Sequence, residues 1–296
     1  MIIKQLNLVN KPFGYKNWTS IEGISASDLN IDKTFNCGQC FRWQKLGERS
    51  VWGGVIGNEY IIISQFINNS VNRNELAINT VNKSTVDKVL NYLDIYTDYT
   101  SKLIIPETDI FANESYKEGQ GIRILNQDAW EATISFIISQ RNNIPKIQST
   151  IEKLCILFGE PIQDQSGKTF YTFPTAKILM NADRNKLLQS GVGYRDVYII
   201  EAARTIYNKN IDLDKLKHTD ISGSQVVDIL TTMYGIGPKV ANCIALFGLH
   251  KLDTWPIDIW MQRVSDELYN GNLNPNDYGE YCGIMQQYMF YNMRKF

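Results

Sequence analysis

The hydrophobic pattern of the chain changes once, near residue 105, and this change limits the fold more than any other feature. Before it, "VWGGVIGNEYIIIS" (51–64) alternates apolar and polar residues and then becomes a β-branched run, as strands do. One segment there, "STVDKVLNYLDIY" (84–96), has apolar residues at helical spacing. Beyond residue 105 the spacing is helical. The pattern therefore predicts an α+β fold, in which an antiparallel β-sheet domain with covering helices (1–104) precedes an all-helical domain (105–296).

Acidic and hydroxyl residues mark where helices of the second half begin. Asp128 and Asp183 each precede a segment with helical spacing, and their side chains suit the N-cap position. We expect Ser224 or Asp228 to begin the helix around "VVDILTTM". A final helix is expected from about Asp277 to the C-terminus.

The composition supplies enough apolar residues for two cores and leaves the binding partner open. The chain has 296 residues, of which 44% are hydrophobic and 21% charged. No apolar run approaches the ~20 residues that cross a bilayer, and the N-terminal segment lacks the features of a signal peptide, so we expect a cytoplasmic protein. A net charge of −1 neither indicates nor excludes DNA, because a local basic strip can coexist with an acidic remainder.

The five cysteines are interpreted as buried, reduced thiols. Cys37 and Cys40 form a lone C-x-x-C, a spacing found in redox pairs and in half of a metal site. Nothing else clusters with them, and the chain has only two histidines. We therefore predict no metal site.

The stretch "YGIGPKVANC" (234–243) follows one helical segment and opens another through a Gly-x-Gly turn, which is the pattern of a helix–hairpin–helix. Gly235 and Gly237 permit backbone conformations that let a phosphate approach amide groups beside a helix N-terminus. An ordinary turn between two helices that needs glycine explains the same residues. The hairpin alone therefore does not decide between a DNA-binding role and a structural one.

Lys239 and Asp258 are the residues near this hairpin that suit catalysis. Lys239 stands at a helix start, where the dipole disfavours a charged ammonium and so favours the neutral amine that a Schiff-base nucleophile needs. Asp258 is the natural N-cap of its helix, yet a carboxylate also stabilises the cation-like sugar formed when a glycosidic bond breaks. Contact with phosphate or solvent would explain Lys239 alone, and capping would explain Asp258 alone. Together they favour cleavage of a glycosidic bond by an amine.

At this point the chain resembles a known family along nearly its whole length. "LTTMYGIGPKVANCIALFGL…WPIDIW" is similar to the helix–hairpin–helix/Gly-Pro-Asp superfamily of base-excision DNA glycosylases, and more narrowly to the 8-oxoguanine DNA glycosylase/abasic-site lyases. "FNCGQCFRWQ" (35–44), "QDAWEATISFIISQRNNI" (127–144), "GVGYRDVYI" (191–199) and "GIMQQYMFYNMR" (283–294) match further segments in order. The resemblance implies a helical helix–hairpin–helix glycosylase domain and a bifunctional enzyme that excises 8-oxoguanine in base excision repair.

The resemblance assigns chemistry to the two residues already singled out. Lys239 falls on the nucleophile that attacks C1′ and forms the Schiff base, and Asp258 falls on the catalytic aspartate. No cofactor is implied beyond a monovalent cation held by backbone carbonyls of the hairpin, including that of Ile236. The implied partner is double-stranded DNA containing 8-oxoguanine, bound by a monomer that is associated with the nucleoid if the source is prokaryotic.

Four other residues are implied to hold the damaged base after it is flipped out of the duplex. The carbonyl of Gly38 accepts the N7 hydrogen that only the oxidised base carries, and Gln286 reads the Watson–Crick edge. Cys243 and Phe290 sandwich the base. The spacing of Cys243 and Phe290 is equally compatible with plain core positions.

Contacts with the DNA strands are implied around the two remaining motifs. Tyr194 matches the residue wedged into the opened stack, and Arg195 matches one that contacts the orphaned cytosine. Arg141, beside Asn142, stands where the family has an asparagine that touches this cytosine. Lys146 replaces an arginine, and lysine cannot make the same planar bidentate contact. Recognition of oxidised guanine is therefore expected to be intact, whereas selectivity for the opposite base is left open.

Other functions remain as alternatives. An alkylation-repair glycosylase of the same superfamily generally lacks the lysine. An oxidised-pyrimidine glycosylase of the endonuclease III type carries a four-cysteine cluster near its C-terminus, where this chain has only Cys282. A non-catalytic helix–hairpin–helix DNA-binding module needs neither Asp258 nor the base-binding set. Borohydride trapping separates these functions, because only a Schiff-base enzyme becomes covalently attached to DNA.

Overall fold

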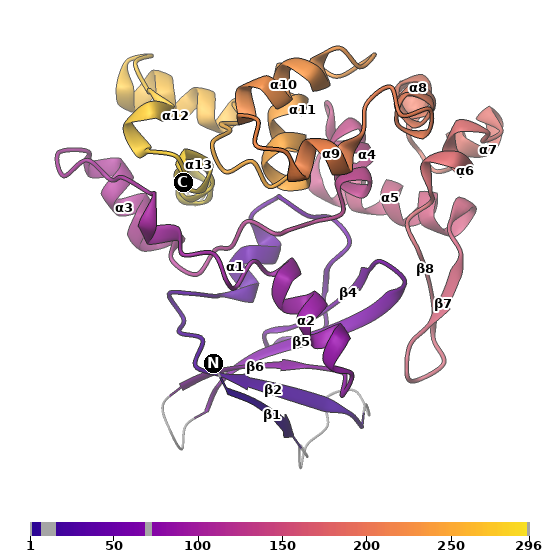
Figure 1. The fold of residues 1–296 in the computed structure, drawn as a ribbon, viewed down its shortest axis with the longest axis horizontal. Helices are drawn as coiled ribbons and strands as arrows, with labels where there is room; N and C mark the ends of the chain where they lie inside the picture. Colours follow the sequence, from indigo (N-terminus) through magenta and orange to yellow (C-terminus); the bar gives the residue numbers. More distant parts are fainter. Residues whose placement is uncertain (1, 7–15, 69–72, 295–296) are drawn as a thin grey trace.

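The first half of the chain forms a six-stranded antiparallel sheet in a computed structural model that describes residues 2–6, 16–68 and 73–294 (Figure 1). Neighbouring strands pair antiparallel in the order β1-β2-β6-β5-β4-β3. The strands are β1 (Ile2–Leu6), β2 (Trp18–Glu22), β3 (Gln44–Lys45), β4 (Val51–Ile56), β5 (Glu59–Asn68) and β6 (Arg73–Ile78). The predicted α+β class is confirmed.

Both faces of this sheet are buried. Successive side chains along a strand point to opposite faces, so neighbouring residues join different cores. In β5, Ile61 and Ile63 join one hydrophobic core, whereas Ile62 between them joins the other. Helix α2 (Lys83–Tyr92) covers the first face with its apolar side. The helix predicted over 84–96 therefore exists and ends before the expected residue.

The second half is a set of helices stacked above the sheet (Figure 1). No helix of the described ranges combines the length and apolarity that would span a membrane. The helices of this half are α3 (Ile110–Gly119), α4 (Ala129–Ser139), α5 (Ile144–Phe158), α6 (Ala176–Met180), α7 (Arg184–Gln189), α8 (Asp196–Tyr207), α9 (Leu213–His218), α10 (Gly223–Thr231), α11 (Pro238–Cys243), α12 (Ile259–Tyr269) and α13 (Cys282–Met293). Helix α1 (Ile31–Asn36) belongs to the first half. Short turns of other helix types are η2 (Tyr99–Ser101), η3 (Gly193–Arg195), η4 (Ile244–Gly248) and η5 (Pro275–Tyr278).

The predicted helix starts are confirmed at some positions and wrong at others. Asp128 and Asp183 cap α4 and α7 by accepting hydrogen bonds from backbone amides of the first turn. The predicted start of α10 is wrong, because Ser222 forms a capping box with Gln225 two residues before Ser224. The predicted start of the last helix is also wrong. Residues 275–278 form η5, and Gly279 (φ +77°) ends that turn, so α13 begins only at Cys282.

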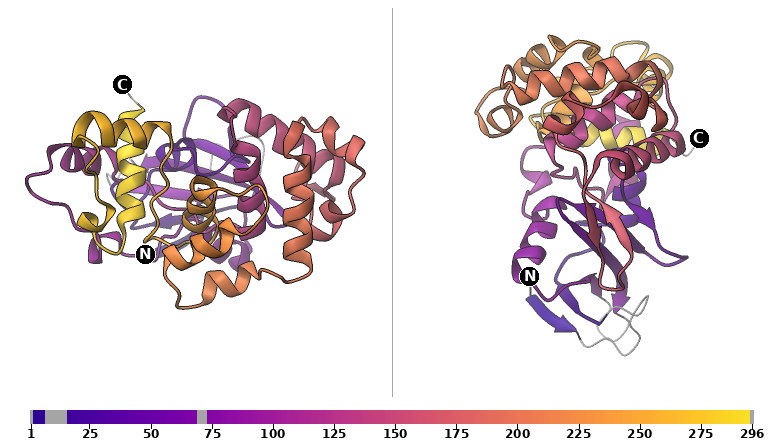
Figure 2. Two further views of the ribbon diagram at one scale, coloured as in Figure 1. Left: turned by 90° about the horizontal axis from the view of Figure 1, so that it is seen from above. Right: turned by 90° about the vertical axis from the view of Figure 1, so that its right-hand side faces the viewer.

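A short hairpin of β7 (Pro161–Gln163) and β8 (Thr169–Tyr171) was not predicted from the sequence. It reaches from the helical half down along the sheet (Figure 2). There the Phe170 ring stacks on Tyr60 of β5, with 3.6 Å between ring centroids and 13° between ring planes. The hairpin therefore ties the two halves together at a distance from the helix–hairpin–helix.

The segment from Cys37 to Trp43 contributes to both hydrophobic cores. Cys37 and Phe41 pack into the core of the helical half, whereas Cys40 and Trp43 pack into the core of the sheet. The cysteine prediction is confirmed in that every cysteine is buried and free. Burial raises the pKa of the Cys37 thiol to about 11, so the thiol is protonated at neutral pH. The proposed division at residues 104 and 105 remains a prediction.

Candidate active site

The turn between α10 and α11 has the geometry expected of the hairpin. Gly235 lies at φ +82°, a conformation that side chains resist, and the Ile236 amide donates to the Met233 carbonyl at 3.1 Å. Gly237 caps α11 with an ordinary φ of −91°, and Pro238 follows as its first residue. The chain therefore turns sharply and presents the next residue at a helix start.

A glycine at position 235 is required by its neighbour as well as by its φ. A Cβ atom added there would lie 2.3 Å from the ring of Tyr198 on α8. We expect Gly235→Ala to lower the melting temperature, since the left-handed conformation alone costs about 1–2 kcal/mol. Because the hairpin must shift, we also expect the single-turnover rate of the base excision that the resemblance implies to fall by about 100-fold.

Gly237→Ala is the matched control for the stability part of this prediction. A Cβ atom at Gly237 would meet nothing within 4 Å, and the φ there is ordinary. Its melting temperature should equal that of the native protein. Equal melting temperatures for both variants would show that the conformation of Gly235 does not constrain the hairpin.

A cavity of about 1230 Å³ opens beside this hairpin. Its lining includes six of the residues predicted from the sequence: Gly38, Arg141, Asn142, Lys239, Asp258 and Phe290. These residues come from both halves of the chain and from five separate segments. The structure thus brings the two predicted catalytic residues to one space.

Asp258 is the N-cap of α12, and the cap uses only one of its two carboxylate oxygens. Its Oδ1 atom accepts from the backbone amides of Trp260 at 3.0 Å and Met261 at 2.9 Å. Both bonds fall on the same oxygen, so the cap leaves Oδ2 for another partner. Capping and catalysis are therefore compatible functions of this side chain.

Lys239 is exposed on the first turn of α11 and is coupled to a buried thiol one turn later. Burial raises the pKa of the Cys243 thiol to about 11, and the nearby Lys239 ammonium opposes part of this rise. The Asp258 carboxylate adds to the rise. The three groups therefore lie within electrostatic reach of one another, although Cys243 itself does not line the cavity.

Gly38, which also lines the cavity, is held in place by a buried network of hydrogen bonds. Its φ of +83° suits glycine, and a Cβ atom there would lie 3.6 Å from the Phe290 ring. The neighbouring Gln39 is fully buried, donates to the Arg123 carbonyl at 2.7 Å and accepts from the Leu125 amide at 2.8 Å. These bonds fix the loop, so the position of Gly38 against Phe290 is determined by the core.

Gln286 is buried with one half of its amide unused. Its Nε2 donates to the Pro256 carbonyl at 3.0 Å. Its Oε1 is buried and accepts from no group in the described part of the chain. An unpaired buried acceptor is costly and calls for an explanation.

Arg195 is buried, and its guanidinium supports the backbone that follows α4. Its side chain is only 7% exposed, and its Nε donates to the Gln140 carbonyl at 3.0 Å. Further bonds reach Val192 at 3.1 Å and the Arg141 carbonyl at 3.5 Å. Arg141 itself lies at φ +49°, a left-handed conformation that asparagine tolerates better than arginine.

The remaining DNA-contact candidates lie outside the cavity, near this turn. Tyr194 is 52% exposed and packs edge-on against Tyr198, with ring centroids 6.0 Å apart. Lys146 on α5 is exposed, and its Nζ lies over Gly191, 3.4 Å from where a Cβ would be. Sequence reasoning missed Gln140 and Tyr198, whose contacts with the hairpin join residues distant in the chain and leave no local signal.

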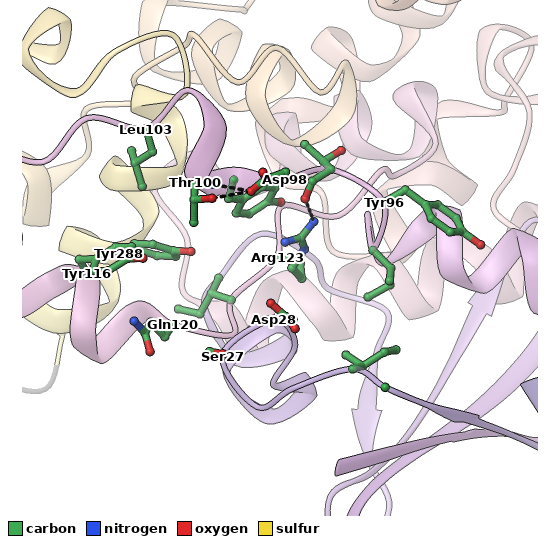
Figure 3. Close-up of a pocket in the computed structure, with 16 residues that line it drawn as sticks. Ser27, Asp28, Tyr96, Asp98, Thr100, Leu103, Tyr116, Gln120, Arg123 and Tyr288 are labelled. Atoms are coloured by element: carbon green, nitrogen blue, oxygen red, sulfur yellow. Dashed lines mark hydrogen bonds between the residues drawn. The ribbon is translucent and has the colours of Figure 1, made fainter. Parts of the chain in front are cut away.

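A second cavity of about 640 Å³ lies between the sheet half and helices α3 and α13 (Figure 3). Arg123 stands at its centre, donates to the Thr97 carbonyl at 2.7 Å and stacks on the Tyr99 ring at 3.7 Å. Tyr116 and Tyr288 form another wall. None of the predicted site residues lines this cavity.

The fold and the site together define a class of protein. A helix–hairpin–helix whose lysine lines a cavity together with an aspartate at the start of a later helix is what the resemblance to the HhH-GPD superfamily predicts. Residues 134–280 match the model of the HhH-GPD superfamily base excision DNA repair proteins, and residues 23–133 match that of the 8-oxoguanine DNA glycosylase N-terminal domain.

Individual relatives agree with these matches. The N-glycosylase/DNA lyase of Saccharomyces cerevisiae is 32% identical over 86% of this chain and 72% of its own. The structure of MBOgg1 in complex with a low affinity DNA ligand superposes with a TM-score of 0.84 at 33% identity, over 100% of this chain and 99% of that one. The Clostridium acetobutylicum 8-oxoguanine glycosylase/lyase, in complex with dsDNA containing cytosine opposite to 8-oxoG, gives 0.82 at 27% identity, over 100% and 98%. The chain belongs to the 8-oxoguanine DNA glycosylase family and is an enzyme of the N-glycosylase/DNA lyase class.

Proposed function

We propose that this protein is a bifunctional glycosylase/lyase that excises 8-oxoguanine from double-stranded DNA through a Schiff base on Lys239. The observation that carries the proposal is that Lys239 and Asp258 line one cavity together with Gly38 and Phe290. The proposed catalytic groups and two of the proposed base-binding residues thus share a space. We further propose that it acts as a monomer.

The chemistry follows from the two side chains. The neutral amine of Lys239 bonds to C1′ as the N-glycosidic bond breaks, and the base departs with the bonding electrons and is protonated. The Oδ2 atom of Asp258, free of the cap, faces the positive charge that develops on the sugar and stabilises it. Ring opening and proton loss then convert the adduct to an imine, from which loss of a C2′ proton eliminates the 3′ phosphate.

The base-binding wall suits an oxidised purine. We propose that the Gly38 carbonyl accepts the N7 hydrogen of 8-oxoguanine and that the base lies between Phe290 and Cys243. The unpaired Oε1 of buried Gln286 supports a contact with the Watson–Crick edge, because a donor on the base would satisfy it.

The hairpin also offers backbone carbonyls, which are oxygen ligands suited to a monovalent cation. Two of them are already used in the protein, since the Met233 carbonyl accepts from the Ile236 amide and the Gly235 carbonyl accepts from Gln140. We propose that a cation, if bound, rests on the neighbouring carbonyls, including that of Ile236. It would fix the hairpin, and no chemical step above depends on it.

The proposal is tested with duplexes that carry 8-oxoguanine opposite each of the four bases, incubated with and without borohydride. We expect base release from these duplexes and a covalent protein–DNA adduct with borohydride. Duplexes that carry an alkylated purine or an oxidised pyrimidine serve as comparison substrates. Faster excision from either comparison duplex, or base release without any adduct, would replace the proposed function with one of its rivals.

Preference for the opposite base is expected to be weaker here than in relatives with an asparagine and an arginine at positions 141 and 146. We expect Arg141→Asn combined with Lys146→Arg to raise excision opposite cytosine relative to adenine, since a bidentate contact is worth roughly 1–3 kcal/mol. Asparagine also suits the left-handed φ of residue 141, so the melting temperature should not fall. Single-turnover rates opposite C, T, G and A give the measurement, and an unchanged ratio would show that these positions do not set the preference.

A further inference from the structure

We propose that Gln140 is a positioning residue. It couples the hairpin that precedes Lys239 to residues 194–195, the segment that the resemblance places against the DNA. This inference rests on the proposed function, because it concerns the placement of the Lys239 nucleophile. The Gln140 Nε2 donates to the Gly235 carbonyl at 3.0 Å, within the hairpin itself. The main-chain carbonyl of Gln140 accepts from the Arg195 Nε at 3.0 Å. One residue therefore contacts both segments with different groups.

The backbone around Gln140 explains how it reaches in two directions. It is the C-cap of α4, with φ −57° and ψ 123°, so the chain leaves the helix at this residue. Arg141 then adopts the left-handed conformation at φ +49°. This turn presents the Gln140 carbonyl to Arg195 and its side chain to the hairpin. Gln140 is half-buried, and its main-chain carbonyl is held by the guanidinium of Arg195, which is itself almost fully buried.

The hairpin is restrained by a ring on one side and is open on another, so a hydrogen bond is needed to fix its position. Gly235 is pressed against the Tyr198 ring, which stops movement toward α8. Tyr198 in turn packs against Tyr194, one residue before Arg195. Nothing lies within 4 Å of a Cβ at Gly237, so the hairpin is open on another side. The hydrogen bond from Gln140 holds the Gly235 carbonyl, and hence the start of α11, in register with the Tyr194–Arg195 segment.

The consequence is kinetic. A displacement of about 1 Å in a reacting group lowers a rate by about 100-fold. A tether on the hairpin therefore acts mainly on the step in which Lys239 attacks C1′. DNA affinity, which depends on many phosphate contacts, should change little when the tether is lost.

The test uses two substitutions of the same residue in the full-length protein. We expect Gln140→Leu to lower single-turnover excision and borohydride trapping by about 10- to 100-fold, with the dissociation constant for the damaged duplex changed by less than about 3-fold. Gln140→Glu keeps the shape but carries a carboxylate toward the Gly235 carbonyl. As the pH falls from about 8 to about 5, a growing share of the glutamate is protonated and donates to that carbonyl. Its rate relative to the native protein should therefore rise on acidification, whereas that of Gln140→Leu should stay constant.

Gln148→Leu, the same change at a half-buried position of α5 outside the cavity, is the matched control and should excise at the native rate. Native excision and trapping by Gln140→Leu would overturn the inference. So would an equal, pH-independent deficit in both Gln140 variants, because that result indicates packing alone. If the native protein forms no adduct with DNA, the Schiff-base function itself fails, which is a distinguishable result.

Discussion

Lys239→Gln is expected to abolish both base release and the borohydride-trapped adduct, while the damaged duplex is still bound within a few-fold of the native affinity. A glutamine amide is not nucleophilic, so neither the covalent step nor the imine can form. The side chain is exposed at the start of α11, so the substitution removes a charge near the Cys243 thiol and no core packing. The melting temperature should therefore be unchanged. Gel shift, single-turnover excision and trapping on one duplex measure the three quantities.

Lys177→Gln provides a charge-matched control, since this exposed lysine on α6 lies outside the cavity. It should excise and trap like the native protein. Persistent trapping by Lys239→Gln would identify another amine as the nucleophile, and the proposal for Lys239 would then be wrong.

Asp258→Asn is expected to slow base excision by about 100- to 1,000-fold, the usual cost of removing one preorganised electrostatic group, or about 3–4 kcal/mol. The substitution keeps an oxygen at the Oδ1 position, where the two amide bonds of the cap are made. Asparagine caps helices about as well as aspartate, so the melting temperature should stay within a degree or two. The loss is therefore expected in the rate and not in the amount of folded protein.

Asp183→Asn isolates the effect of the cap from that of the charge. Asp183 caps α7 in the same way, by accepting from the Lys186 amide at 2.8 Å, and does not line the cavity. Its activity and melting temperature should match those of the native protein. If excision by Asp258→Asn fell only in proportion to the folded fraction, Asp258 would be a cap and nothing more.

Features that depend on neighbouring residues could be predicted from the sequence, and features that depend on distant ones could not. The caps at Asp128, Asp183 and Asp258 follow from residue type and local spacing, and the structure has them. The hairpin is local as well. The predicted start of α10 was wrong because two serines and a glycine compete for the cap within three residues, and only the reciprocal bonds of the capping box with Gln225 decide.

The features that the sequence did not predict depend on contacts between residues far apart in the chain. Gln140 and Gly235 are 95 residues apart, and no periodicity relates them. The buried position of Arg195 was also not foreseen, because an arginine in a turn reads as a surface residue. Of the four base-binding residues that the resemblance predicts, Gly38 and Phe290 line the common cavity, whereas Cys243 and Gln286 do not.

The segment from Cys37 to Trp43 has a consequence for how substrate range and reaction chemistry can diverge. Gly38 approaches the cavity on a loop whose anchor, Gln39, bonds to backbone groups outside the hairpin. Lys239 and Asp258 stand at helix starts in the other half of the chain. Under the proposed function, mutations that shift the loop would alter which lesion is accepted and leave Lys239 and Asp258 in place. Selection could therefore retune damage recognition and reaction rate as two nearly independent traits, each with its own set of permitted substitutions.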